Sequence, residues 1–129
     1  TNDAVYEANF VIDILRKYNV SPSELSYPVY YDLERTQISK AQNIANMNAF
    51  ISTMNANGYT AHVYSYRAML NDTLNDPSIW ANVSWMAAYT NTIGWSNPYY
   101  KGNFGWQYTS SGTIPGISGS VDISCWYVI

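Results

Sequence analysis

Residues 26–36, SYPVYYDLERT, place two acidic residues at the end of an apolar and aromatic run. The run at 28–34 has the composition of a β-strand, and carboxylates are among the groups least often buried in proteins. Because residues two apart on a strand point to the same face, Tyr30, Asp32 and Glu34 are expected to share one face. Two interpretations follow: the strand ends and the acids face water, or a site requires two acids at one point.

The spacing of apolar residues predicts two main helices and five strands. Helical spacing covers residues 1–20 and 38–58. Apolar runs that suit strands lie at 28–34, 59–66, 83–90, 104–110 and 121–128. A short irregular helical connection is expected at 67–80, and a loop rich in Gly, Asn and Pro at 91–103.

This order of elements predicts an α/β fold. Strands that alternate with helices early in the chain imply parallel βαβ units, and apolar strands imply burial on both faces, as in an α/β barrel. The later strands are joined by connections that are too short for full helices. The sequence contains no repeat, linker or low-complexity tract, so we expect residues 1–129 to form a single domain.

Composition excludes several classes of function. The net charge is −3, and the six Lys and Arg residues are scattered, so no basic stripe indicates a nucleic-acid partner. No run approaches the roughly 18 apolar residues that a membrane span requires. Cys125 and His62 are the only residues of their types, which argues against an internal disulfide and a metal cage. Thirteen Tyr and five Trp suit either an aromatic core or a surface that stacks on sugar rings.

The acids and aromatics suggest where chemistry takes place. Asp32 and Glu34 would repel each other and raise the proton affinity of one, as an acid–base pair for glycoside hydrolysis requires. Solvated turn residues, or caps of the next helix, are the alternative. Asp122, in SGSVDIS, is a third candidate, with a capping or turn aspartate as its alternative. Trp85 and Trp106 lie among aromatics near the expected strand ends, where a sugar cleft or an aromatic core is possible.

Four segments in this order resemble the second half of the glycoside hydrolase family 25 lysozymes: YPVYYDLE (27–34), GYTAHVYS (58–65), WMAAYT (85–90) and GWQYTSSGTIPGISGSVDIS (105–124). The resemblance covers nearly the whole chain, and the last segment is its most specific part. It implies a partial, modified TIM-like β/α barrel with about the last five strands and two main helices. It also implies a muramidase that cleaves the β-1,4 bond between N-acetylmuramic acid and N-acetylglucosamine in bacterial peptidoglycan.

The resemblance implies a role for each matching residue. Glu34 would be the catalytic acid, and Asp32 would orient the substrate acetamido group or stabilise the developing positive charge. Asp122 would be a further active-site acid. The expected partners are peptidoglycan glycan strands at an extracellular or cell-wall location, with no metal or organic cofactor. The residues expected to contact the glycan are Tyr30, Tyr64, Trp85, Tyr89, Trp106 and Gln107.

The sequence departs from the family at two places. Ala88 stands where the family usually carries Gln or a similar polar residue, which removes one expected glycan contact. The family's first three strands, one of which carries an active-site aspartate, have no counterpart. A remainder of five strands would leave two edges unpaired, one of them the apolar run at 28–31. We therefore expect a fragment, a partner in an assembly, or a rearranged fold, completed by self-association or by the missing strands.

Two other functions fit the same residues. A non-catalytic glycan-binding module would use the aromatic residues, although three retained acids argue against a pure binder. A glycosidase that acts on chitin-like polymers would also use an Asp-x-Glu strand end.

Overall fold

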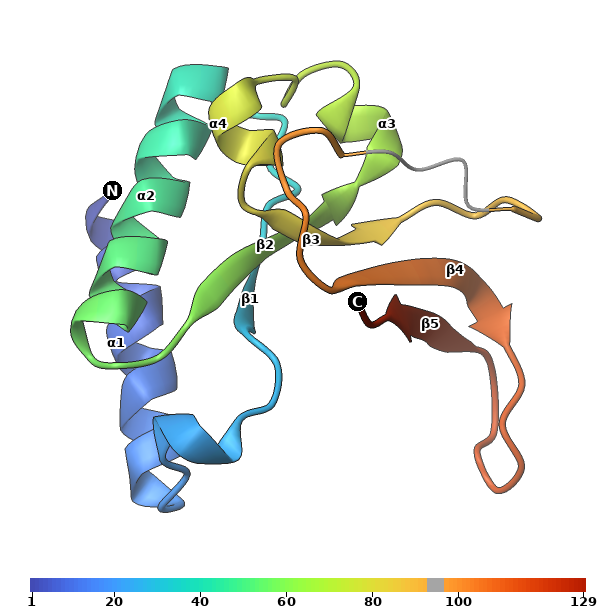
Figure 1. The fold of residues 1–129 in the computed structure, drawn as a ribbon, viewed down its shortest axis with the longest axis horizontal. Coiled ribbons are helices and arrows are strands. Elements are labelled where there is room, and N and C mark those ends of the chain that lie inside the picture. Colours follow the sequence, from blue (N-terminus) through green and yellow to red (C-terminus); the bar gives the residue numbers. More distant parts are fainter. Residues whose placement is uncertain (93–96) are drawn as a thin grey trace. The chain divides into compact units, whose positions relative to one another are not determined.

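The computed structural model describes residues 1–92 and 97–129 (Figure 1), so part of the loop expected at 91–103 lies outside the described residues. The described chain contains five strands in the sheet order β1-β2-β3-β4-β5 and two long helices, α1 and α2. The prediction of an α/β fold is confirmed. The chain divides into two compact units, residues 1–63 and 64–129, which are taken in turn. That all 129 residues form a single domain stays a prediction.

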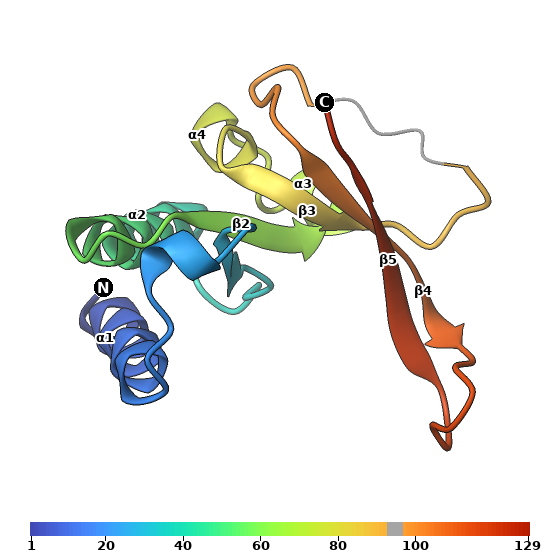
Figure 2. The same ribbon diagram turned by 60° about the horizontal axis from the view of Figure 1, so that its bottom comes forward.

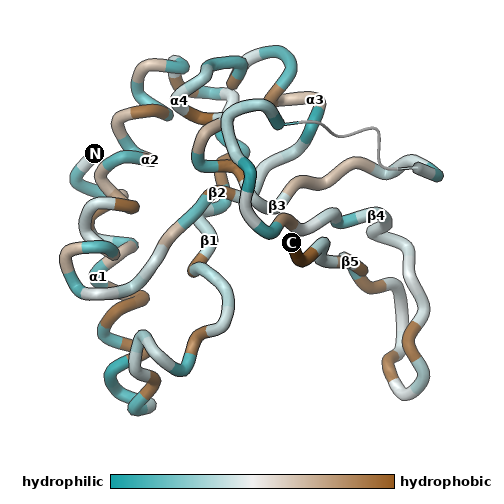
Figure 3. The backbone as a smooth tube through the Cα atoms, in the orientation of Figure 1, coloured by the Kyte–Doolittle hydropathy of each residue, from teal (hydrophilic) through white to brown (hydrophobic). Residues whose placement is uncertain are grey.

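In the first unit, α1 (Asn2–Lys17) packs against α2 (Lys40–Ala56), and the two helices lie side by side in Figures 1 and 2. Buried residues of α1 recur every fourth position, at Ala4, Ala8 and Ile12. The buried side chains of α2 include Met47 and Met54, which fill the core as expected. Hydrophobic segments therefore recur along both helices in Figure 3, as an amphipathic helix requires.

The first strand is shorter than the sequence predicts. β1 (Val29–Asp32) ends two residues before Glu34, so the argument that Tyr30, Asp32 and Glu34 share one strand face is wrong for Glu34. Leu33, the first residue after β1, is 1% exposed and buried like Tyr31, while Asp32 between them is exposed. A short 3₁₀ helix, η1 (Pro22–Glu24), precedes the strand.

β2 (Ala61–Tyr66) follows α2 and carries alternating buried and half-buried residues. The prediction that the strands are fully buried on both faces is therefore wrong for β2. It is also wrong for β5, whose residues are half-buried or exposed. Only one face of β2 is fully covered, which leaves its other side chains in partial contact with solvent.

The second unit contains the last three strands, each of which carries at least one tryptophan. The strands are β3 (Val83–Ala87), β4 (Phe104–Gly112) and β5 (Val121–Tyr127). Before them come α3 (Arg67–Leu70) and α4 (Pro77–Trp80), which form the short helical connection expected at 67–80. β3 and β4 are parallel, whereas β4 and β5 are antiparallel and form the long hairpin of Figure 2.

Gly105 on β4 allows two tryptophan rings to approach the sheet. A Cβ atom at this position would lie 2.6 Å from the ring of Trp126 and 2.8 Å from that of Trp85. Glycine is therefore required by space rather than by backbone conformation.

No described helix is long and apolar enough to cross a membrane.

Candidate active site

The first unit contains an acidic pocket of about 320 Å³. Tyr31 and Asp32 come from β1, Glu34 and Arg35 follow directly after it, and Glu7 comes from α1. The structure thus brings the two predicted acids, Asp32 and Glu34, to one pocket. Neither Glu7 nor Arg35 was predicted. Glu7 reaches the pocket only because α1 packs beside this region, which local spacing does not encode, whereas Arg35 directly follows Glu34 in the sequence.

The backbone of the acidic pocket is fixed on both sides of Glu34. Before it, the ring of Tyr31 stacks on Phe50 with centroids 4.7 Å apart, and Leu33 is buried. After it, Nδ2 of the buried Asn43 donates to the carbonyl oxygen of Arg35 at 2.8 Å. The carboxylates therefore project from a segment that is anchored to the core.

The surroundings of Asp32 and Glu34 favour the protonated form of both carboxyl groups. Partial desolvation, and then the negative charge of Asp32, raise the pKa of Glu34 above its ordinary value. Desolvation also raises the pKa of Asp32. Burial and the negative charge of Glu7 raise the pKa of Tyr31, and the positive charge of Arg35 partly offsets this rise. A carboxyl group that keeps its proton to higher pH is suited to act as a general acid.

Neither acid caps the following helix. The N-cap of α2 is Ser39, whose Oγ accepts from the backbone N–H of Gln42 at 3.1 Å. The capping alternative for Asp32 and Glu34 is therefore wrong. Asp122 is an exposed residue within β5, so a helix-capping role is also excluded for it.

The second unit contains an aromatic cluster around Trp85. The ring of Tyr64 lies 4.6 Å from that of Trp85, which in turn lies 5.2 Å from that of Trp126. The indole N–H of Trp85 donates to Oγ of Ser124 at 3.2 Å. Trp126 and Ser124 were not predicted, since only the antiparallel register of β5 on β4 brings them here.

Gln107 connects two of the other predicted residues, Tyr64 and Tyr89. Its Oε1 accepts from the hydroxyl of Tyr64 at 3.0 Å and from that of Tyr89 at 2.7 Å. The neighbouring Trp106 is 9% exposed, and its indole N–H donates to the carbonyl oxygen of Ala88 at 2.7 Å. Trp106 is thus held as a core residue would be, and its contact with a glycan stays a prediction.

The contact of Tyr30 with a glycan and the active-site role of Asp122 stay predictions. The ring of Tyr30 meets that of His62 edge-on, with centroids 6.5 Å apart and an interplanar angle of 82°. Burial lowers the pKa of His62, so the imidazole is neutral near pH 7. Asp122 lies exposed on β5.

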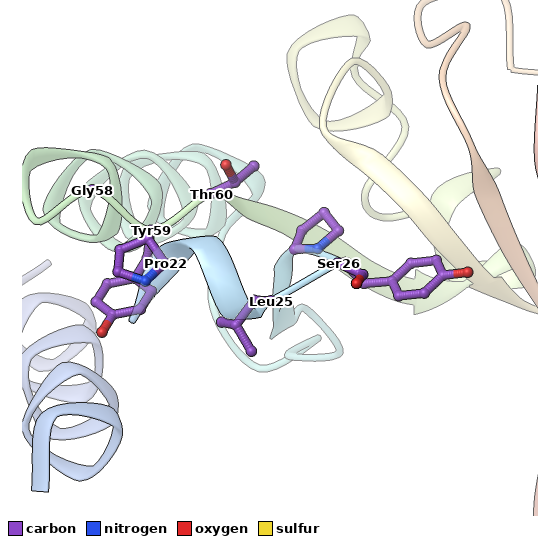
Figure 4. Close-up of a pocket in the computed structure, with 8 residues that line it drawn as sticks. Pro22, Leu25, Ser26, Gly58, Tyr59 and Thr60 are labelled. Atoms are coloured by element: carbon purple, nitrogen blue, oxygen red, sulfur yellow. The ribbon is translucent and has the colours of Figure 1, made fainter. Parts of the chain in front are cut away.

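The first unit has a second cavity of quite different chemistry. It measures about 220 Å³ and lies between η1 and the segment before β2 (Figure 4). Pro22, Leu25 and Tyr59 are among its lining residues, which include no acid, histidine or lysine. This cavity offers no acid–base pair.

Among the described residues, no group of three or more His, Cys, Asp or Glu side chains is arranged to hold a metal ion.

Comparison with known proteins identifies the family. The model of the glycosyl hydrolases family 25 matches residues 1–117. The chain belongs to glycosyl hydrolase family 25. No curated protein sequence matches the chain significantly.

Solved structures agree with the family 25 assignment. The modular autolysin LytC from Streptococcus pneumoniae is 42% identical, with a TM-score of 0.88 over 98% of this chain and 31% of that chain. LytC in complex with a synthetic peptidoglycan ligand gives a TM-score of 0.87 over the same shares, also at 42% identity. The spore cortex lytic enzyme SleM from Clostridium perfringens, at 17% identity, shares the fold with a TM-score of 0.75 over 97% of this chain and 44% of that chain. The chain therefore spans less than half the length of these proteins.

Proposed function

We propose that this family 25 chain is a peptidoglycan muramidase that cleaves the β-1,4 bond between N-acetylmuramic acid and N-acetylglucosamine. The acidic pocket carries the proposal, because two carboxyl groups lie together there and both have raised pKa values. Glycoside hydrolysis requires one carboxyl that gives a proton and one that stabilises or activates. Membership of the family and the peptidoglycan ligand of LytC support the same substrate class.

Glu34 would act as the general acid. Partial desolvation, and then the negative charge of Asp32, raise the pKa of Glu34 and favour its protonated form. Glu34 would transfer this proton to the glycosidic oxygen as the C–O bond breaks. Water then supplies a hydroxyl group to the sugar carbon and a proton that restores Glu34. The charge that develops on the sugar is positive, so an ionised Asp32 would stabilise it or orient the acetamido group. The family resemblance adds Asp122 as a further acid.

The aromatic cluster supports a carbohydrate substrate. The rings of Tyr64 and Trp85 are half-buried, which leaves part of each available for contact with a sugar. Aromatic faces suit the apolar faces of pyranose rings. The proposed place of action is the bacterial cell wall, in agreement with the autolysin and endolysin names of the structural neighbours.

The test is release of soluble muropeptides and new reducing ends from purified Gram-positive cell walls. We expect release by the unsubstituted chain and none by Glu34→Gln. Asp13→Asn is the matched control, because Asp13 is an exposed carboxylate on α1 that does not line the acidic pocket. Release by Glu34→Gln at the rate of the control would exclude Glu34 as the acid.

The same assay separates the alternatives. Binding to walls without any new reducing ends would contradict hydrolysis by this chain and favour a glycan-binding module. Cleavage of chitin oligomers in preference to peptidoglycan would contradict the proposed substrate.

A further inference from the structure

The side of α1 that faces away from the core carries large apolar side chains, which we call the apolar stripe. Its members are Tyr6, Phe10 and Ile14, at 71%, 57% and 41% exposed, and their spacing of four residues makes them neighbours on one side of the helix. Each buried residue of α1 precedes one of them by two positions. Two residues turn an α-helix by about 200°, so the apolar stripe lies opposite the buried face. In Figure 2, α2 lies on one side of α1, and the rest of the first unit leaves the opposite side uncovered. Exposed apolar side chains gathered on one face mark a contact surface.

Two opposite charges lie at equal distances from the centre of the apolar stripe. Asp3 lies seven residues before Phe10 and Lys17 seven residues after it, and residues seven apart share one side of a helix. At 1.5 Å per residue, each charge is about 10 Å from Phe10 along the helix axis. Both charged residues are exposed. The other basic residue of the last turn, Arg16, is bonded elsewhere, because its Nη2 donates to Oδ1 of Asn57 at 2.9 Å.

We propose that the apolar stripe binds a second copy of this chain, with the two α1 helices antiparallel about a two-fold axis at Phe10. Such an interface brings together residues that lie equally far before and after the axis. Phe10 meets Phe10 of the second copy, and Tyr6 lies beside Ile14 of the second copy. Asp3 faces Lys17 of the second copy, and the symmetry forms this ion pair twice.

The charges favour this occupant over the alternatives. A parallel pair of helices would place Asp3 beside Asp3 and Lys17 beside Lys17, where like charges repel. A surface of anionic lipids would be repelled by Asp3, Glu7 and Asp13, which are exposed on this helix. Glu7 and Asp13 lie three residues before and three after Phe10, on opposite flanks of the apolar stripe, so in the antiparallel pair they stay at the hydrated rim.

The first test is sedimentation velocity of the 129-residue chain from about 5 to 500 µM. One helix pair is smaller than a standard protein interface, so we expect a weak dimer with a Kd on the order of 100 µM. Phe10→Glu places two like charges on the axis and should weaken association by roughly tenfold or more. The matched control is Ile117→Glu, at a position that is 53% exposed between β4 and β5. A chain that stays monomeric throughout would overturn the inference and point to a different polypeptide as the occupant. Equal association of Phe10→Glu and Ile117→Glu would overturn it as well.

Charge reversal tests the antiparallel arrangement. Asp3→Lys and Lys17→Asp each place like charges opposite one another twice, so each chain alone should associate roughly three- to tenfold more weakly. An equimolar mixture of the two chains should recover the association of the unsubstituted chain, because each new charge then faces its opposite. The controls are Asp72→Lys and Lys101→Asp, the same charge changes at exposed positions outside α1.

Recovery in the mixture separates the interface from the helix itself. Both reversals also disfavour the ends of α1, where the helix dipole prefers the original charges, and far-UV circular dichroism measures any loss of helix. That loss would persist in the mixture, since each chain keeps its own substitution. A mixture that associates no better than either chain alone would overturn the inference.

A cross-link gives a second measurement that needs no charged substitution on the axis. Phe10→Cys, in a chain in which the half-buried Cys125 is replaced by serine, places two thiols at the two-fold axis. Oxidised glutathione should convert this chain to a disulfide-linked dimer, and Asn9→Cys, exposed on α1 but outside the apolar stripe, should form far less. Equal yields from the two positions would overturn the inference.

Discussion

Replacement of Asn43 by leucine is expected to reduce hydrolysis far more than it reduces folding stability. Asn43 is 2% exposed, and its Nδ2 holds the carbonyl oxygen of Arg35, one residue after Glu34. Oδ1 of the same amide is buried and has no hydrogen-bond partner within the described part of the chain. Leucine has a similar shape and removes both polar ends of the amide together.

The two ends of the Asn43 side chain have opposite effects on the free energy of unfolding. Loss of the bond from Nδ2 leaves the Arg35 carbonyl without its partner, which costs about 1–3 kcal/mol. Removal of the unbonded Oδ1 relieves a desolvation penalty of about the same size. We therefore expect a net loss of about 1 kcal/mol or less for Asn43→Leu, equivalent to roughly 3–5 °C in Tm.

Asn43→Asp is the contrasting variant. It keeps the shape of the side chain but has no donor for Arg35 when ionised, and it places a charge where there is no partner. A loss of about 3 kcal/mol or more is expected, as for other uncompensated buried charges. Stability is measured by urea unfolding of both variants in parallel. A loss near 3 kcal/mol for Asn43→Leu as well would refute the opposing-effects reasoning.

Activity is measured as the initial rate of reducing-end release from cell walls. Because the Asn43 bond fixes the backbone next to the proposed acid, we expect Asn43→Leu to lower kcat by a factor on the order of ten to a hundred. The control is Asn46→Leu on the same helix, whose buried Oδ1 accepts from Gln42 at 2.8 Å and does not contact the acidic pocket. An equal loss of kcat in both variants would show that activity only follows stability.

Three further predictions concern single side chains. Desolvation and, to a smaller extent, the charge of Asp32 raise the pKa of Glu34, so Asp32→Asn should move the basic limb of the pH–rate profile to lower pH. Turnover should fall more than binding, and an unmoved limb contradicts the coupling. Glu34→Gln should raise stability at pH 7, because a carboxyl whose folded-state pKa is raised loses its stabilising contribution as the pH rises. This gain should vanish in acid, and a urea series from pH 3 to pH 7 tests it, with Asp13→Asn as control. Trp106→Ala should cost about 3–5 kcal/mol in urea unfolding, and lost glycan affinity at unchanged stability would show that Trp106 is not a core residue.

Local patterns predict the elements of this fold well and their ends less well. The helical spacing in residues 1–20 and 38–58 matches α1 and α2, because the buried stripe of an amphipathic helix is visible in the sequence itself. The end of β1 was placed two residues late. The apolar and aromatic pattern of PVYYDLE continues past the last residue of β1, Asp32, so the pattern alone does not show where the strand pairing ends.

The candidate site was predictable only where its residues are neighbours in sequence. Asp32 and Glu34 belong to one short segment, and the pattern located them. Glu7 reaches the same pocket from α1, and no periodicity records which helix face packs beside which strand. The convergence of Tyr64 and Tyr89 on Gln107 was not predictable for the same reason. The three residues come from three strand regions, and the order of the strands in the sheet, which local patterns do not give, brings them together.

The position of the two acids at and just after the end of β1 suits the competing demands that the proposed catalytic role places on a carboxyl. Its backbone must be fixed, which the stacked ring of Tyr31, the buried Leu33 and the anchored Arg35 carbonyl achieve. Its side chain must be desolvated enough to raise its pKa and open enough to meet a polymer. A site deep in the core would satisfy the first condition and exclude the substrate, and a free loop would satisfy the second and lose the geometry. The end of a short strand beside two packed helices meets both, and this is why an apolar run can end in two acids without a loss of fold.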